Sequence, residues 1–169
     1  KRIAQALARC DADLVCDYQA AWLPGPFGWS RAFIPDQTVL VTAADSAAPE
    51  KLAAVAGHPV GTVLGYAYPE VAEALGDGFK RDDAPDAIAN LRKLELGRVA
   101  HVLTGRRLLD YRRRIGSFTL ALHAPLVVAE VQGQCALSPR SPVTLAELNT
   151  AIQGLVAQGE LGHILGKYR

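Results

Sequence analysis

The chain has 169 residues, of which 50% are hydrophobic and 21% are charged, so it is long enough for one domain with a sizeable core or for two small lobes. Its formal net charge of +1 gives no indication of a nucleic-acid partner, and no apolar run approaches the roughly 18 residues that a membrane span requires. The sequence contains neither a signal peptide nor a methionine, and we expect it to be a processed form or a fragment.

Hydrophobic periodicity and turn residues predict strands and helices that alternate along the chain. The predicted strands cover residues 12–16, 37–43, 58–65, 78–83, 99–105 and, as an extended stretch with a proline break, 118–138. The predicted helices cover residues 1–10, 45–57, 68–76, 84–99, 106–114 and two segments within 141–169. Thr144 can cap the first of these two segments, with Glu147 three residues later completing a capping box. This alternation is typical of an α/β protein with a parallel sheet.

The stretch VGTVLGYAYPEVAEAL, residues 60–75, has the pattern of a buried strand that breaks at Gly65 and continues as a helix. Where a strand ends and a helix begins, backbone N–H groups are left unpaired and point toward whatever lies in front of them. We therefore expect one wall of a ligand cleft here, facing the aromatic stretch DYQAAWLPGPFGWS at residues 17–30. A plain tight turn is the alternative for Gly65.

The other reactive side chains form no catalytic or metal-binding pattern. The histidines and cysteines lack metal-ligand spacing, so we expect no metal and no cofactor. Ser30 lacks the following glycine of a nucleophile elbow. Asp82 and Asp83, next to Lys80 and Arg81, are expected to form an exposed turn. The arginines of residues 106–114 are expected to form a solvated helix face.

The three cysteines leave their pairing open. Cys10 ends a predicted helix, whereas Cys16 and Cys135 lie on predicted strands. A bridge between Cys16 and Cys135 is at least as plausible as one between Cys10 and Cys16. Buried free thiols are the remaining alternative.

Five stretches, taken together and in order, resemble the bacterial extracellular solute-binding proteins of amino-acid-binding family 3, which have the type 2 periplasmic binding protein fold. Each contributes a loose motif, and the five cover almost the whole chain. They are residues 2–15, 27–42, 51–68, 87–111 and 135–168. The resemblance implies two α/β lobes that are joined by hinge strands and close on a ligand.

In this interpretation the first lobe consists of residues 1–43 and 131–169, and the second lobe of residues 44–130. The family begins with a strand, a helix and a second strand for which this chain has no counterpart. The first lobe would then be incomplete and would expose strand edges and apolar surface. The resemblance therefore implies completion by a missing segment or by another chain, for example in a dimer.

The chain departs from the family at both clamps for a zwitterion. The family's arginine for the ligand carboxylate is absent from residues 20–29, and Arg31 lies in a position that usually faces away. Where the family has an aspartate for the ligand ammonium, this chain has Gly105, preceded by Thr104. Because burying unpaired charges is costly, we do not expect an ordinary α-amino acid in the usual pose.

What remains is a neutral cleft lined by aromatic rings, hydroxyls and backbone amides, suited to a small polar or aromatic molecule. Core packing is the alternative for each aromatic side chain, Phe27 among them. The predicted ligand-binding residues are Tyr18, Trp22, Trp29, Ser30, Gly65, Tyr66, Ala67, Tyr68, Thr104 and Gly105.

The resemblance implies a non-enzymatic, exported periplasmic protein that delivers its ligand to the permease of an ABC importer. A periplasmic sensor domain of a signalling receptor is a related alternative. An enzyme similar to cyclohexadienyl dehydratase is a rival, but it requires an ionisable group in the cleft, and the sequence offers none that is convincingly placed. A degenerate scaffold that binds a partner protein is the third alternative.

Overall fold

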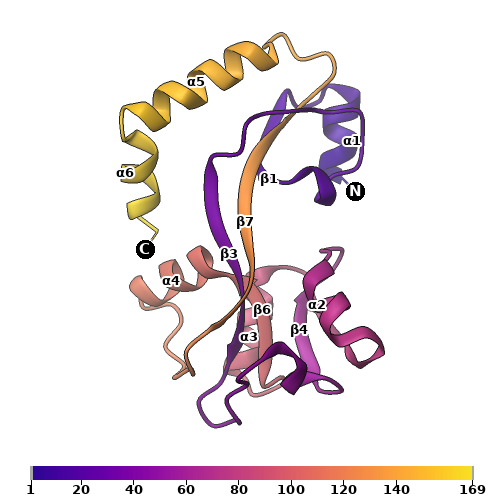
Figure 1. The fold of residues 1–169 in the computed structure, drawn as a ribbon, viewed down its shortest axis with the longest axis vertical. Coiled ribbons are helices and arrows are strands. Elements are labelled where there is room, and N and C mark those ends of the chain that lie inside the picture. The colour runs from indigo at the N-terminus through magenta and orange to yellow at the C-terminus, as the bar shows by residue number, and fades with distance from the viewer. Residues whose placement is uncertain (1, 169) are drawn as a thin grey trace. The chain divides into compact units, whose positions relative to one another are not determined.

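The computed structural model describes residues 2–168, and the chain divides into two compact units. The first unit consists of Lys1–Asp36 and Val131–Lys167, and the second of Gln37–Glu130 with Tyr168–Arg169. Two long strands connect them: β3 (Ile34–Thr42) carries the chain into the second unit and β7 (Leu126–Leu137) returns it to the first (Figure 1). Each unit is described below by itself.

In the first unit, β7 is the central strand. It pairs antiparallel with β1 on one side and with β2 on the other, and Leu137 is the partner of both Leu14 and Gly28. The elements of this unit are α1 (Arg2–Arg9), β1 (Leu14–Tyr18), the short 3-10 helix η1 (Ala20–Trp22), β2 (Gly28–Trp29), α5 (Leu145–Ala157) and α6 (Glu160–Gly166). The predicted capping box is confirmed, because the Thr144 side chain accepts from the Glu147 N–H and the Glu147 carboxylate accepts from the Thr144 N–H.

A small core and a disulfide hold the first unit together. Its buried cluster consists of Leu7, Leu23, Phe27 and Ala136. Cys16 and Cys135, cross-strand partners on β1 and β7, form a disulfide, which is one of the two pairings that the sequence left open. Cys10 is a free thiol whose sulfur accepts a hydrogen bond from Arg140 Nε at 3.1 Å.

The second unit contains a mixed sheet in which the neighbouring strands run β7-β3-β6-β4-β5. Its remaining elements are η2 (Leu52–Val55), β4 (Pro59–Val63), α2 (Pro69–Leu75), η3 (Gly76–Gly78), β5 (Lys80–Ala84), α3 (Ala87–Glu95), β6 (His101–Gly105) and α4 (Arg106–Arg114). β4 is parallel to β5 and to β6, whereas β3 is antiparallel to β6. The expectation of a wholly parallel sheet is therefore wrong. Only the strands joined by crossover helices are parallel, since a parallel connection needs such a crossover.

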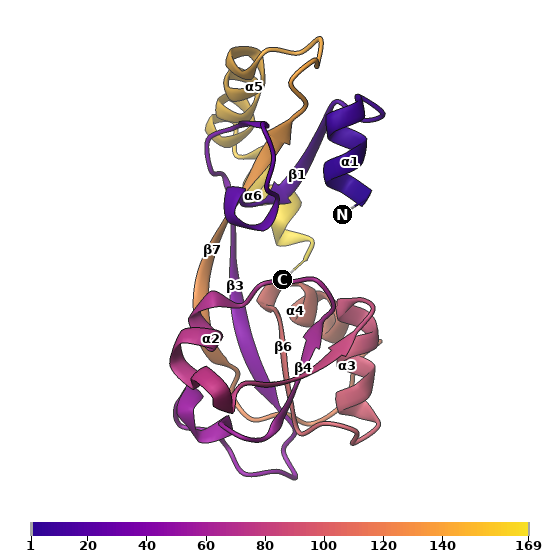
Figure 2. The ribbon, with the colours of Figure 1, turned by 90° about the vertical axis from the view of Figure 1, so that its right-hand side faces the viewer.

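Helices cover both faces of this sheet, with α2 on one side of β4 and β6 and α3 on the other (Figure 2). Successive side chains of β3 point to opposite faces of the sheet, which explains why they join two different buried clusters. Val39 and Val41 join the cluster under α3 and α4, and Leu40 joins the cluster under α2 and η2. Hydrophobic side chains are thus removed from water on both faces of the sheet.

Two local expectations are wrong. Residues 45–57 do not form a helix of the predicted length, and only Leu52–Val55 makes a short 3-10 turn, because Pro49 interrupts the segment. Asp82 and Asp83 do not form an exposed turn, because they lie on β5, where a parallel ladder to β4 fixes both residues.

Candidate functional site

Two of the predicted ligand-binding segments follow parallel strands of the second unit. β4 and β6 pair in the register Val60 with His101 and Gly61 with Val102. Continuing that register brings the ends of both strands to one edge of the sheet. The loop of residues 64–68 and Gly105 therefore leave the sheet at the same edge, the one at which ligands bind in open α/β sheets.

Residues 64–67 of the loop of residues 64–68 are exposed, whereas Tyr68 is partly buried. Gly65 has a φ of 81°, a left-handed conformation that favours glycine, and no atom lies within 4 Å of the place that a Cβ would take. Leu64 is 67% exposed and Tyr66 is 58% exposed. Within residues 2–168, the backbone N–H groups of Gly65 and Ala67 have no hydrogen-bond partner. The expectation of unpaired amides at this junction is met at these two residues.

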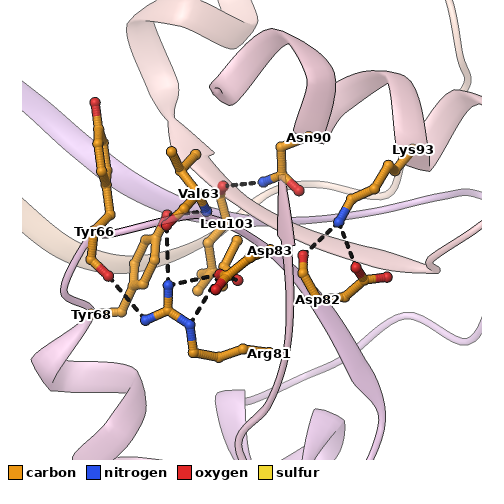
Figure 3. Close-up of polar contacts among 10 residues, drawn as sticks. Val63, Tyr66, Tyr68, Arg81, Asp82, Asp83, Asn90, Lys93 and Leu103 are labelled. Carbon is orange, nitrogen blue, oxygen red and sulfur yellow. Dashed lines mark hydrogen bonds and ion pairs between the residues drawn. The ribbon is translucent and has the colours of Figure 1, made fainter. Parts of the chain in front are cut away.

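Arg81, on β5, makes hydrogen bonds to the backbone of this loop (Figure 3). Its guanidinium donates to the Tyr66 carbonyl at 2.9 Å and to the Val63 carbonyl at 3.1 Å. It also forms an ion pair with Asp83 at 2.8 Å. A hydrogen bond from Thr62, and then the contact with Arg81, lower the pKa of Asp83, so this carboxylate stays charged and is a weak base.

The sequence analysis missed this cluster because it expected an exposed turn at Asp82 and Asp83, although it also predicted a strand over residues 78–83. A signal was present, since residues two positions apart in a strand point to the same side, which would have put the two opposite charges together. Tyr68 completes the cluster: its hydroxyl accepts the Val63 N–H at 3.1 Å, and burial raises the pKa of its phenol.

The end of β6 offers no charged group. Thr104 is 5% exposed, and its Oγ1 is buried without a hydrogen-bond partner among the residues described, as is Oδ1 of the neighbouring Asn90. Gly105 is the N-cap of α4, whose first turn holds no acidic residue. The hydroxyl of Thr104 therefore faces the interior, and an ammonium group would find no carboxylate at Gly105.

The predicted residues of the first unit differ in burial: Ser30 is buried, Tyr18 and Trp29 are partly buried, and Trp22 is exposed. Tyr18 and Trp29 pack against the buried cluster that contains Phe27. Ser30 is 2% exposed, and its hydroxyl donates to the Arg31 carbonyl and accepts from the Cys135 N–H, each at 2.8 Å. Trp22 is 38% exposed. The predicted residues thus form two groups, one in each unit, and Trp22 is the exposed aromatic of the first.

Two searches of the described part of the chain gave negative results. Among residues 2–168, no three His, Cys, Asp or Glu side chains are grouped so that they could hold a metal ion. No helix there is long and apolar enough to cross a membrane.

Comparison with known proteins gives matches at the level of structure. An amino acid ABC transporter substrate-binding protein from Streptococcus pneumoniae, bound to L-arginine, superposes with a TM-score of 0.79 and is 17% identical. The match covers 99% of this chain and 72% of that one. This chain has the type 2 periplasmic binding protein fold. The expected fold class is confirmed.

Two further solved structures match the fold with slightly lower TM-scores. The periplasmic VFT2 domain of Bordetella pertussis BvgS is 18% identical, with a TM-score of 0.77 and coverage of 99% of this chain and 72% of that one. An ancestral amino-acid-binding protein, described as a precursor of cyclohexadienyl dehydratase, is 15% identical, with a TM-score of 0.76 and coverage of 98% and 72%. No family model matches the sequence, and no curated protein does.

Proposed function

We propose that this chain is a non-enzymatic solute-binding protein that takes up a small polar or aromatic molecule and delivers it to the membrane subunits of an ABC importer. The observation that carries the proposal is the exposed loop of residues 64–68. It presents an aromatic ring and unpaired amides at the ligand-binding edge of a sheet with the binding-protein fold. The fold similarity to binding proteins of ABC transporters supports the transport role.

The charges at this edge support a ligand other than a standard α-amino acid. Arg81, the cation that contacts this loop, is engaged by two carbonyls and by Asp83, and Gly105 supplies no carboxylate. The ammonium of a zwitterion would find no carboxylate at Gly105 or in the first turn of α4, and burying it unpaired would cost several kcal/mol. A ring with a carbonyl or hydroxyl oxygen would instead stack on Tyr66 and accept a hydrogen bond from the Ala67 amide.

A thermal-shift screen of aromatic acids, sugars, polyamines and amino acids tests this proposal. A compound present at 100 times its Kd should stabilise the protein by about 2.7 kcal/mol. Tyr66→Ala should abolish that shift, while Leu64→Ala, a matched change in an exposed side chain of the same loop, should retain it. A standard amino acid that acts at micromolar concentration would contradict the ligand class. An equal shift in wild type and Tyr66→Ala would contradict the site.

A sensor domain of a signalling receptor is a second candidate, favoured by the similarity to the BvgS domain. Both candidates use the same ligand site and differ in the output. Coprecipitation of the purified chain with solubilised permease subunits, with and without ligand, separates them. Binding to the permease supports transport.

A further inference from the structure

We propose that Arg81 is the residue that positions the loop of residues 64–68 for ligand binding, and that its planar guanidinium cannot be replaced by lysine. The inference rests on the proposed function, since it concerns the same loop. Arg81 lies on β5, outside the loop, and donates to the Val63 carbonyl, just before the loop, and to the Tyr66 carbonyl within it (Figure 3). It would act through the loop backbone and would not touch the ligand.

The guanidinium is held in place from several directions. Asp83 Oδ1 accepts from Arg81 Nε at 3.1 Å and from Nη2 at 2.8 Å, and the same oxygen accepts the Thr62 hydroxyl at 2.5 Å. The Arg81 Cζ atom lies 5.4 Å from the centre of the Tyr68 ring and 5.9 Å from that of Phe79. A planar cation that lies over aromatic rings and is bonded at its edge is restricted in orientation, so the carbonyls that it binds are restricted as well.

All three nitrogens of the Arg81 guanidinium donate hydrogen bonds. Nη1 donates to the Tyr66 carbonyl, Nη2 to Val63 and Asp83, and Nε to Asp83. A lysine ammonium is a single point on a flexible stem and cannot span these acceptors at once. Arg81→Lys should therefore keep the charge opposite Asp83 and lose the link between that charge and the loop.

The hydrogen bond from Arg81 to the Tyr66 carbonyl also sets the orientation of the Ala67 amide. The chain contains no cis peptide bond among its described residues, so the Ala67 N–H points opposite to the Tyr66 carbonyl. With that carbonyl held on Arg81, the Ala67 amide faces away from β5, on the exposed side of the loop. Gly65 gives the loop access to other conformations, which a released Tyr66 carbonyl would allow.

Hydrogen–deuterium exchange of the ligand-free protein tests the inference without any ligand. The reporters are the Leu64 amide, which donates to the Ala84 carbonyl at 2.8 Å, and the Tyr66 amide, which donates to the Val63 carbonyl at 3.1 Å. Arg81→Gln and Arg81→Lys should both speed exchange of these amides by about tenfold, since hydrogen bonds to a charged group are lost. Lys80→Gln removes a charge from the neighbouring position of the same strand and should leave the rates unchanged.

Exchange rates of residues 64–68 within about twofold of wild type in both Arg81 variants would overturn the inference. Faster exchange spread evenly over β4, β5 and the loop would overturn it too, since it would show general loss of stability. A thermal shift with sodium benzoate is then measured on the same proteins. A shift in wild type and Lys80→Gln that is lost in Arg81→Lys supports a role in binding. No shift in wild type counts against an aromatic acid as ligand, while the exchange rates still decide the role of Arg81.

Discussion

The two units differ in how many hydrophobic side chains they bury. In the second unit, the sheet has a buried cluster on each face, and residues such as Val102 and Leu103 are fully buried. In the first unit, the described residues form one smaller cluster, and α5 and α6 each bury a single residue, Ile152 and Leu165. Large apolar side chains are exposed in both units, for example Val156 at 50% in the first and Leu96 at 56% in the second.

This difference shows two ways of stabilising a small unit. The second unit relies on burial of apolar area, which grows with the number of layers. The first unit buries less and adds a disulfide that joins β1 to β7. Because both tryptophans, Trp22 and Trp29, lie in the first unit, their fluorescence reports on that unit alone, so the two can be followed separately.

The largest effect is expected from removal of the disulfide. Replacing Cys16 and Cys135 by serine should lower the free energy of unfolding of the first unit by about 3–4 kcal/mol, because its unfolded state gains freedom. Urea titration followed by tryptophan fluorescence should show the loss, while amide exchange of β4 and β6 should not change. Cys10→Ser, at the free thiol, is the control. Equal loss in both units would mean that they unfold as one.

The reverse result is expected for the core of the second unit. Leu103→Ala should cost about 3 kcal/mol, since a fully buried leucine leaves a cavity between β6 and α2. Amide exchange in β4 and β6 should accelerate while the tryptophan transition stays in place. Leu7→Ala, at an equally buried leucine of the first unit, should do the opposite. A tryptophan transition that moves in Leu103→Ala would contradict the separation of the units.

Much of the fold could be predicted because it follows from local patterns. The apolar run Val39, Leu40 and Val41 predicts a strand, which the structure buries on both faces, and Thr144 with Glu147 predicts a helix start, without knowledge of any distant partner. The helix predicted over residues 45–57 failed because a weak apolar pattern was given more weight than Pro49.

The site was harder to predict because residue type does not reveal which partner a side chain finds. Tyr18 and Trp29 have aromatic rings that suit a ligand platform, and in the structure both are partly buried against the core of their unit. Ser30 binds the backbone of Cys135, which is 105 positions away. The contacts of Arg81 with Val63 and Tyr66 form only when β4 and β5 pair. The sequence around Arg81 therefore does not indicate that it contacts these two residues.

A smaller, pH-dependent difference between the units is expected from His101. This side chain is 8% exposed, and its Nδ1 lies 2.9 Å from the Thr42 hydroxyl. Burial, and then the nearby His58, lower the pKa of His101, so the folded unit holds it neutral where the unfolded chain would protonate it. The stability from this group is complete above pH 6.5 and is lost as the pH falls from there toward the lowered pKa.

Urea titrations at pH 7.5, 6.5 and 5.5, followed by amide exchange in β6, measure this dependence. The second unit should weaken toward the lowest pH more steeply than the tryptophan transition of the first unit. His101→Gln should flatten the slope, whereas His163→Gln, at an exposed histidine of α6, should leave it unchanged. The same slope in wild type and His101→Gln would show that another group is responsible.

The smallest effect, and the finest test of the first unit, is expected at the start of α5. Thr144→Ala removes a side chain that bonds both the Glu147 N–H at 3.2 Å and the Glu147 carboxylate at 2.7 Å, and should cost the helix about 1 kcal/mol. Thr144→Ser keeps the hydroxyl and should be close to wild type. Since α5 buries only Ile152, amide exchange at its N-terminus should rise while the tryptophan transition moves by less than the cost to the helix. If the transition moves by the full amount, α5 unfolds together with the disulfide-linked strands, and the small core of the first unit is more cooperative than its burial indicates.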